Sequence, residues 1–385
     1  EKIAVTSGGV DIRTGRYAYS KTDVSIGDGG GAIVVERTMP TPILGHIAPF
    51  GNFSHNWDIL LSIKSSEIDQ YPGQFDYTAN IHFGGRSQTF EKLYLRDSSF
   101  RQKSQNDFTR LTNSGATYTY HATDGTVAVF RPIVEPNSAG QVSLAQVAYV
   151  VEADGTRYDF EYDGAPDRLR SVVSSRGYAA LFEYSGSGRQ VIKTCVLNLG
   201  STAKPANNIC PATPLQASSF TYSTLDARSV MTSATAPDTP VDGFAYTSTV
   251  PGTSYQMAFT KPGQSTPWQT QSREYDFTAE GELHPIVKAQ SFSDGSSFAY
   301  FYDYSPQTED GSGINPQYQT VTGGAYPNGL NQTTEVRYYF PAMPASFNPT
   351  RVIKLGGGGG QPAQAVNVGD IVHQVTPGPA RIIDA

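Results

Sequence analysis

Short stretches of alternating apolar and polar residues recur along the whole chain and constrain its fold more than any other feature. Typical examples are AIVVERT (32–38), TVAVF (126–130), RYDFEYD (157–163) and EVRYYF (335–340). β-Branched and aromatic residues dominate these stretches, as expected of pleated, half-buried surfaces. No window of about 12 residues places apolar side chains at the helical spacing i, i+3, i+4, i+7. The sequence therefore predicts strands and little or no helix.

The segments between these stretches have the composition of tight turns. Asp-Gly and Asn-Gly pairs supply the positive φ angles of tight hairpin turns. They occur at Asp28-Gly29, Asp124-Gly125, Asp154-Gly155, Asp163-Gly164, Asp294-Gly295 and Asn328-Gly329. Short strands separated by such turns predict an all-β fold, in which antiparallel hairpins are added side by side into a large curved sheet.

The length of 385 residues suits two or three domains, or one large all-β domain. We divide the chain into an N-terminal β region, residues 1–135, and a second β-sheet region, residues 136–385, with a cysteine loop at 195–210. One continuous β domain is the alternative.

Charge and hydropathy exclude two classes of function. The chain has 28 Lys and Arg residues against 35 Asp and Glu, a net charge of −7. Without a basic stripe to neutralise phosphates, we expect no nucleic-acid binding. No run of about 18 apolar residues is present, so we expect no helical membrane span.

The two cysteines, Cys195 and Cys210, lie in a Thr-, Asn- and Pro-rich stretch. No His cluster or C-x-x-C spacing indicates zinc or redox chemistry, so we expect a disulfide; two unrelated buried thiols are the alternative. A disulfide indicates an oxidising compartment. The chain begins with Glu1 and its first residues lack a signal-peptide pattern, so we expect a processed or excised product.

An internal repeat is clearest between residues 154 and 184. Its characteristic residues are Tyr162, Asp163, Arg168, Leu169, Gly177 and Tyr184. Weaker copies occur at 275–287 and at 294–304, where the corresponding pair is Tyr302-Asp303. This pattern resembles the Tyr-Asp repeat of the Rhs/YD-repeat (rearrangement hotspot) family.

Residues 9–37 resemble the segment that opens the repeat region in that family. The matching residues are Val10-Asp11, Thr14-Gly15, Thr22-Asp23 and Arg37. The stretch from Phe50-Gly51 to Trp57 resembles a Phe-Gly…Gly-Trp element of the family, with Asn56 at the position usually held by Gly. The closing residues GPARIIDA (378–385) resemble the lead-in to a further hairpin.

The resemblance implies a hollow β shell, of which this chain is the N-terminal part of the repeat region. In the family such shells enclose a C-terminal toxin fragment or are displayed at a cell surface. The implied protein is a secreted or cell-surface bacterial protein of the polymorphic-toxin type. Its implied partner is the remaining C-terminal part of the same polypeptide. The family's self-cleaving aspartate motif has no match here.

The sequence predicts no catalytic, cofactor-binding or metal-binding residues. The histidines are scattered, at His46, His55, His82, His121, His284 and His373. No G-x-S-x-G elbow occurs, and the glycine runs at 27–31 and 356–360 lack the Lys-Ser/Thr of a phosphate loop. Asp28 and Asp310 do not complete a calcium-loop signature.

Three carboxylates alternate on one strand and share one face, namely Asp159, Glu161 and Asp163. Paired carboxylates can support glycoside hydrolysis. We expect instead that they are turn formers and cross-strand partners of nearby arginines. Those arginines are Arg157, Arg168 and Arg170.

The sequence therefore favours a non-enzymatic structural module without a cofactor. One alternative is a carbohydrate-binding or adhesive surface protein, in which Trp57 and Trp268 would face solvent; a structural module would bury them. A second is self-assembly, in which residues 366–385 donate a strand to a neighbouring copy. A β-rich glycosidase is the remaining alternative.

Overall fold

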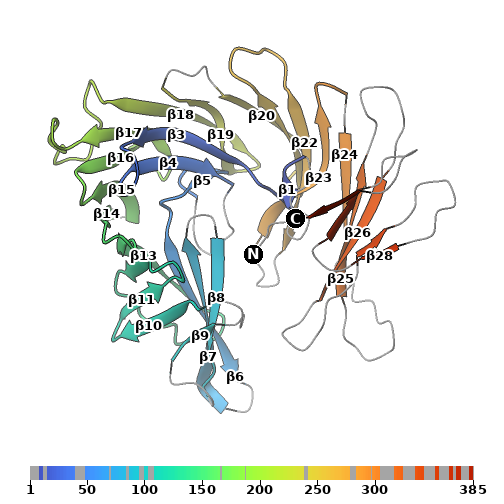
Figure 1. Ribbon diagram of the computed structural model, residues 1–385. Helices are drawn as coiled ribbons and strands as arrows, with labels where there is room; N and C mark the ends of the chain where they lie inside the picture. The colour runs from blue at the N-terminus through green and yellow to red at the C-terminus, as the bar shows by residue number, and fades with distance from the viewer. Residues whose placement is uncertain are drawn as a thin grey trace. The chain divides into compact units, whose positions relative to one another are not determined.

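The computed structural model describes residues 8–11, 15–39, 48–68, 71–83, 86–94, 99–102, 108–164, 167–186, 188–237, 242–277, 283–295 and 297–303, followed by strand segments at 316–323, 334–341, 352–354, 364–366, 370–373 and 381–384. All regular structure in these ranges is β-strand. No helix that could cross a membrane occurs among them. The prediction of an all-β fold is confirmed (Figure 1).

The chain divides into two compact units. The first comprises residues 1–19, 225–227 and 242–385, and the second comprises residues 20–224 and 228–241. Residue 135 lies inside the second unit, and the division into regions 1–135 and 136–385 stays a prediction.

The second unit contains strands β3 to β19. In chain order they are β3 (Ser20–Ile26), β4 (Ile33–Thr38), β5 (Ser54–His55), β6 (Leu60–Ile68), β7 (Tyr71–Phe83), β8 (Arg86–Lys92), β9 (Arg101–Gln102), β10 (Arg110–Ser114), β11 (Thr117–His121), β12 (Val127–Phe130), β13 (Val142–Val151), β14 (Arg157–Gly164), β15 (Asp167–Ser174), β16 (Tyr178–Tyr184), β17 (Val191–Asn198), β18 (Gln216–Leu225) and β19 (Arg228–Thr235). Strands β10 to β19 are neighbours in chain order, which is the predicted side-by-side addition of hairpins. Strands β6 to β9 continue from β13, whose first half pairs with β6.

Two of the predicted Asp-Gly turns form in the described β10–β14 region. In the β11–β12 and β13–β14 turns, Asp124 and Asp154 each accept a hydrogen bond from the main-chain N–H two residues later, at 2.8 Å. Gly125 and Gly155 adopt φ angles of 90° and 82°, which favour glycine. Identical local chemistry thus produces the same turn twice, 30 residues apart.

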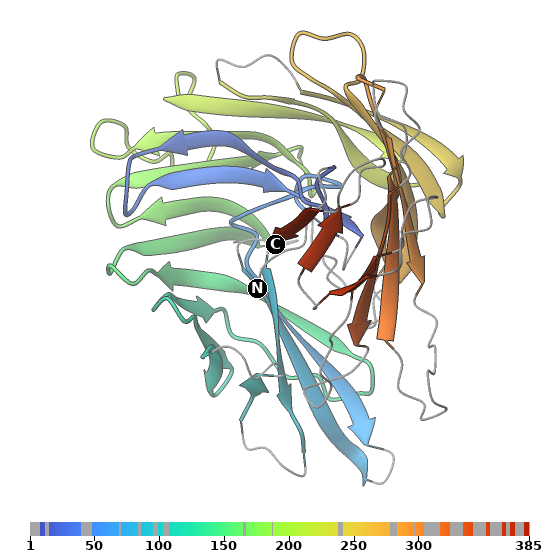
Figure 2. The ribbon, with the colours of Figure 1, turned by 45° about the vertical axis from the view of Figure 1, so that its right-hand side comes forward.

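One part of the second unit's sheet is covered on both faces. Ala179, Ala180, Leu181 and Phe182 are consecutive on β16 and all are fully buried. Because successive strand residues point to opposite faces, both faces of β16 must be covered. The small sheet β3–β4–β5 lies over one face (Figure 1 and Figure 2). The cysteine loop covers the other, where Leu181 packs with Cys195 and Cys210.

The first unit contains the remaining strands. They are β1 (Val10–Asp11), β2 (Arg16–Tyr17), β20 (Asp242–Val250), β21 (Ser254–Thr260), β22 (Gln269–Phe277), β23 (Leu283–Phe292), β24 (Ser297–Asp303), β25 (Pro316–Gly323), β26 (Thr334–Pro341), β27 (Val352–Lys354), β28 (Gln364–Val366), β29 (Asp370–His373) and β30 (Arg381–Asp384). Strands β20 to β28 are again antiparallel neighbours in chain order. Hairpins β1–β2 and β29–β30 pair separately.

An aromatic ladder stabilises the first unit's sheet. Four of its rings come from strands β20, β21, β23 and β24 and one from the residue that precedes β22; in order along the ladder they are Phe244, Phe259, Trp268, Phe292 and Phe298. Successive ring centroids are 5.8, 6.4, 6.0 and 6.0 Å apart. Ring pairs at such distances stabilise beyond their buried area.

Candidate functional site: a motif that joins adjacent hairpins

The repeat motif forms a cluster of charged groups between two neighbouring hairpins. Arg168 of β15 binds Asp163 of β14, with Nη2 to Oδ2 at 2.5 Å and Nε to Oδ1 at 3.0 Å. Its Nη1 donates to the main-chain carbonyls of Gly186 and Gly188, at 2.7 and 2.8 Å. These carbonyls belong to the β16–β17 turn. Arg168 therefore ties the β14–β15 hairpin to the next one, and the Asp163 hydrogen bonds raise the pKa of its guanidinium.

Tyr184 completes this cluster from β16. The Arg168 guanidinium lies 4.9 Å from the centre of its ring. The Tyr184 hydroxyl donates to the Leu169 carbonyl at 2.9 Å. Burial raises the pKa of Tyr184 far above its ordinary value. The predicted motif residues Asp163, Arg168, Leu169 and Tyr184 thus meet at one place.

The other motif residues have separate positions. The Tyr162 ring is half-buried and lies 5.5 Å from the guanidinium of Arg131. Gly177 has a φ of 88° in the β15–β16 turn. Tyr302 and Asp303 end strand β24, and their side chains lie outside the described part of the structure.

The expected cross-strand pairing with an arginine forms for one of the three strand carboxylates, Asp163, whereas Asp159 binds an arginine of its own strand. Asp159 binds Arg157 at 2.6 Å, and Asp163 binds Arg168. Glu161 is different: it binds Lys204 at 2.7 Å, and not one of the three arginines. The expectation was wrong for Glu161 because Lys204 reaches it from the cysteine loop, 43 residues away in the sequence.

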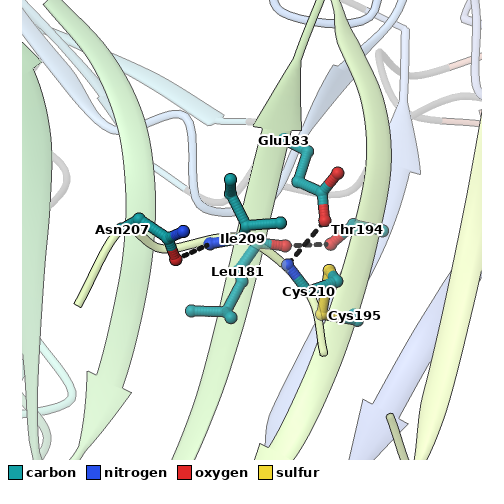
Figure 3. The surroundings of a disulfide bond; sticks show 7 residues. All are labelled: Leu181, Glu183, Thr194, Cys195, Asn207, Ile209 and Cys210. Carbon is teal, nitrogen blue, oxygen red and sulfur yellow. Dashed lines mark hydrogen bonds between the residues drawn. A yellow bond between two sulfur atoms is a disulfide. The ribbon is translucent and has the colours of Figure 1, made fainter. Parts of the chain in front are cut away.

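The cysteine loop is fixed to the sheet at several points (Figure 3). The predicted disulfide joins Cys195 and Cys210, whose Cα atoms are 6.0 Å apart. The N–H of Cys210 donates to Glu183 at 2.5 Å. With Lys204 bound to Glu161, these contacts hold the loop over the apolar cluster around Leu181.

Arg37 anchors the small sheet β3–β4–β5 inside the second unit. Its side chain is fully buried, and Nη2 binds the buried carboxylate of Asp23 at 3.0 Å. Nη1 lies 3.2 Å from the sulfur of Met231, and the guanidinium is 5.7 and 6.0 Å from the rings of Phe53 and Phe220. Arg37 thus connects β4 to β19, 194 residues apart, which no sequence pattern indicated.

Asn56 and Trp57 pair with the edge of β4. The Asn56 amide accepts from the Glu36 N–H at 2.8 Å and donates to the Val34 carbonyl at 2.9 Å. The Trp57 indole N–H donates to the same carbonyl at 2.7 Å. The Asn56 side chain therefore replaces part of a neighbouring strand, which a glycine at this position could not do.

The opposite edge of this small sheet is paired in a similar way. Ser25 of β3 donates its N–H to the Gln216 side chain at 2.9 Å. The Asp23 carbonyl accepts from the Ser218 hydroxyl at 2.6 Å. Since unpaired edge groups invite association with other strands, these side chains protect both edges of the small sheet.

Two residues of the predicted opening segment, Asp11 and Gly15, lie in or beside the β1–β2 hairpin. Asp11 pairs in register with Arg16, and its side chain is not described. Thr14 lies outside the described residues. Gly15 has a φ of 69°, and its carbonyl accepts from the Val287 N–H at 2.8 Å.

Both tryptophans are half-buried, which matches neither the exposure that the carbohydrate-binding hypothesis requires nor the full burial expected of a structural module. Trp57 is half-buried, with its ring 5.0 Å from that of Tyr158. Trp268 is also half-buried, within the aromatic ladder, and the Lys261 ammonium lies 4.7 Å from its ring. The structure gives no support to stacking on sugar rings at these two residues.

The glycine run at 27–31 is explained by close packing. A Cβ atom at Gly31 would lie 2.1 Å from Cγ of Arg176, and one at Gly30 would lie 2.2 Å from the Asp154 carboxylate. The β3–β4 turn can therefore approach the turns beneath it only with glycine. Within the ranges that the structure covers, no three His, Cys, Asp or Glu residues gather as metal ligands.

Comparisons with known proteins give only distant structural likenesses. No protein-family model and no curated protein sequence matches the chain. The crystal structure of TcdB2-TccC3-Cdc42 has 10% identity and a TM-score of 0.36, over 95% of this chain and 21% of that one. A Photorhabdus luminescens Tc holotoxin pore with a TccC3 mutation has 10% identity and a TM-score of 0.35, over 95% and 24%.

A third structure, TcdB2-TccC3, has 10% identity and a TM-score of 0.33, over 96% of this chain and 23% of that chain. The chain spans a quarter or less of the length of these three structures. The fold and the site together define an all-β protein, built from successive hairpins, in which motif residues join neighbouring hairpins.

Proposed function

We propose that the chain is a non-enzymatic structural module of a secreted or cell-surface protein of the Rhs/YD-repeat type. In this proposal it forms part of a β shell that encloses or presents a C-terminal region of the same polypeptide. The repeat motif and the opening segment of the sequence are the basis for naming that type. The disulfide favours an oxidising compartment.

The observation that carries this proposal is the use of Arg168. An arginine and a carboxylate in a catalytic site must have polar atoms available to a substrate. Here the Arg168 guanidinium is occupied by Asp163 and by two carbonyls of the neighbouring turn. A charged motif that binds the next hairpin's main chain serves to hold a wall of hairpins together.

The small sheet β3–β4–β5 supports the same role. Its central arginine, Arg37, is buried with Asp23 and aromatic rings, and both of its edges are paired by side chains. Such a layer reinforces the sheet that it covers and offers no free strand edge at these positions. The chemistry of the opening segment is therefore structural.

The test uses the complete gene product. The coding sequence downstream of Ala385 is read, and the whole protein is compared with its isolated C-terminal part by limited proteolysis. We expect the C-terminal part to be cleaved much more slowly within the whole protein. Equal cleavage rates, or a stop codon directly after Ala385, would contradict the proposal.

A parallel screen tests the claim that the module is not an enzyme. The folded chain is assayed on polysaccharide, ester, phosphoester and peptide substrates, with the heat-unfolded chain as control. We expect no turnover above the control. Turnover that is lost on unfolding would refute the claim.

A further inference from the structure

A row of buried amide side chains lies on one face of the first unit's sheet. Gln269 and Gln271 are on β22, and Gln290 on β23 pairs in register with Gln271. All three are at most 2% exposed. Buried amides are normally fully hydrogen-bonded, so such a row requires an explanation.

The oxygen atoms of the row are all in use. The Gln269 oxygen accepts from the Tyr17 hydroxyl at 3.0 Å, and the Gln271 oxygen accepts from Arg273 Nε at 2.9 Å. The Gln290 oxygen accepts from the Tyr300 hydroxyl at 2.6 Å.

The nitrogen atoms differ. Gln290 Nε2 donates to the Gly8 main-chain carbonyl at 2.8 Å. Among the residues that the structure describes, Nε2 of Gln269 and Nε2 of Gln271 have no hydrogen-bond partner. The row therefore presents two unused donors beside one donor that already binds a main-chain carbonyl.

The segment that covers this face binds it through main-chain carbonyls as well as through the Tyr17 side chain. The Gly8 carbonyl meets Gln290, and the Gly15 carbonyl accepts from the Val287 N–H of β23. A Cβ atom at Gly8 would lie 2.1 Å from the Gln290 oxygen, so the main chain approaches as closely as glycine allows. One amide of the row thus already binds a main-chain carbonyl of the covering segment.

The spacing of the two free donors suits a further length of main chain. Residues two apart on a strand are separated by about 7 Å. Carbonyl oxygens on one side of an extended chain repeat at the same interval. Gln269 and Gln271 are two apart on β22, so both can donate to one extended chain that runs along this strand. The free groups are pure donors, which suits carbonyl oxygens better than hydroxyls.

We propose that the amide row Gln269, Gln271 and Gln290 is a binding site for the main chain of an extended polypeptide. The β1–β2 hairpin is its resident occupant, and an incoming chain lifts this hairpin to reach the two covered donors. This inference deepens the structural function proposed above and rests on it for the nature of the partner, a polypeptide.

The test measures binding of a fluorescently labelled, neutral 15-residue peptide of Ser, Thr and Val to the full chain. The double variant Gln269→Glu, Gln271→Glu keeps the oxygens that bind Tyr17 and Arg273 and removes both free donors. The matched control is Gln256→Glu, Gln264→Glu, which changes two exposed glutamines by the same charge. We expect binding about tenfold weaker, or lost, in the first double variant and unchanged in the control.

Hydrogen exchange locates the bound peptide. We expect it to speed exchange of the Ala18 N–H, bound to the Gly9 carbonyl at 2.7 Å, and of the Val287 N–H. Absence of peptide binding, equal binding by both double variants, or binding that leaves these two protons unchanged would overturn the inference. If the peptide binds but the C-terminal part is not protected from proteolysis in the whole protein, the proposed function alone is contradicted. If the C-terminal part is protected from proteolysis but the peptide does not bind, the amide-row site alone is contradicted.

Discussion

Replacing Arg168 with methionine tests whether the repeat motif holds adjacent hairpins together. The variant keeps much of the side chain's apolar length and removes the Asp163 ion pair with both carbonyl contacts. The guanidinium end is well shielded, since the side chains of Arg168 and Asp163 are 14% and 28% exposed. Hydrogen bonds to charged groups contribute about 1.5–3 kcal/mol each, reduced where solvent reaches the pair. We expect Arg168→Met to lower the free energy of unfolding by about 3 kcal/mol.

Arg157→Met is the matched control. Arg157 binds Asp159 at 2.6 Å on the same strand, but the two side chains are 47% and 52% exposed. Exposed ion pairs contribute about 0.2–1 kcal/mol. The expected loss is therefore about 1 kcal/mol or less, although the distance and the residue types match those of the Arg168 pair.

Urea unfolding followed by Trp57 fluorescence measures both losses. Trp57 lies against Tyr158 in the second unit, so a Trp268→Phe background makes the signal report on that unit alone. We expect a clearly lower urea midpoint for Arg168→Met than for Arg157→Met, at an unchanged slope. Similar small losses in both variants would refute the reasoning.

Three further predictions follow from the second unit. Gly31→Ala should lower the melting temperature more than Gly29→Ala, because both have positive φ but only Gly31 has a neighbour, Arg176, where the new Cβ would lie; equal losses would contradict the close-packing explanation. Asn56→Asp keeps the hydrogen-bond acceptor and removes the donor, so it should lower the free energy of unfolding in urea by about 1 kcal/mol. An unchanged midpoint would show that the β4 edge does not need the Asn56 donor. Burial raises the pKa of Tyr158 from 10.0 to about 12. Because folding favours the neutral phenol, the contribution of Tyr158 to stability is complete below pH 10 and is lost as the pH rises from 10 to 12. A melting temperature that stays constant between pH 10 and 12 would contradict this prediction.

Local chemistry made much of the fold predictable. Asp124-Gly125 and Asp154-Gly155 form the expected hairpin turns because the turn geometry depends on two or three adjacent residues. The same holds for the strands, whose alternation reflects one buried face. The clustering of Asp163 with Arg168 followed from the hairpin register.

Contacts between distant segments were not predictable. Arg37 reads as an ordinary strand residue, yet it is buried with Asp23 and Met231, which lies 194 residues away. Glu161 binds Lys204 of the cysteine loop, since that loop folds back onto the sheet. The continuous burial along β16 also depends on contacts between distant segments, because two separate segments cover its two faces.

Hydrogen exchange of the Arg168→Met variant tests the central claim most directly. The claim is that a motif residue of one hairpin fixes the turn of the next, the turn that carries Gly186 and Gly188. We predict faster exchange concentrated in the β16–β17 hairpin, with β10–β12 unchanged and with no such effect in Arg157→Met. Unchanged protection of β16 and β17, or a uniform increase over the whole second unit, would contradict the claim.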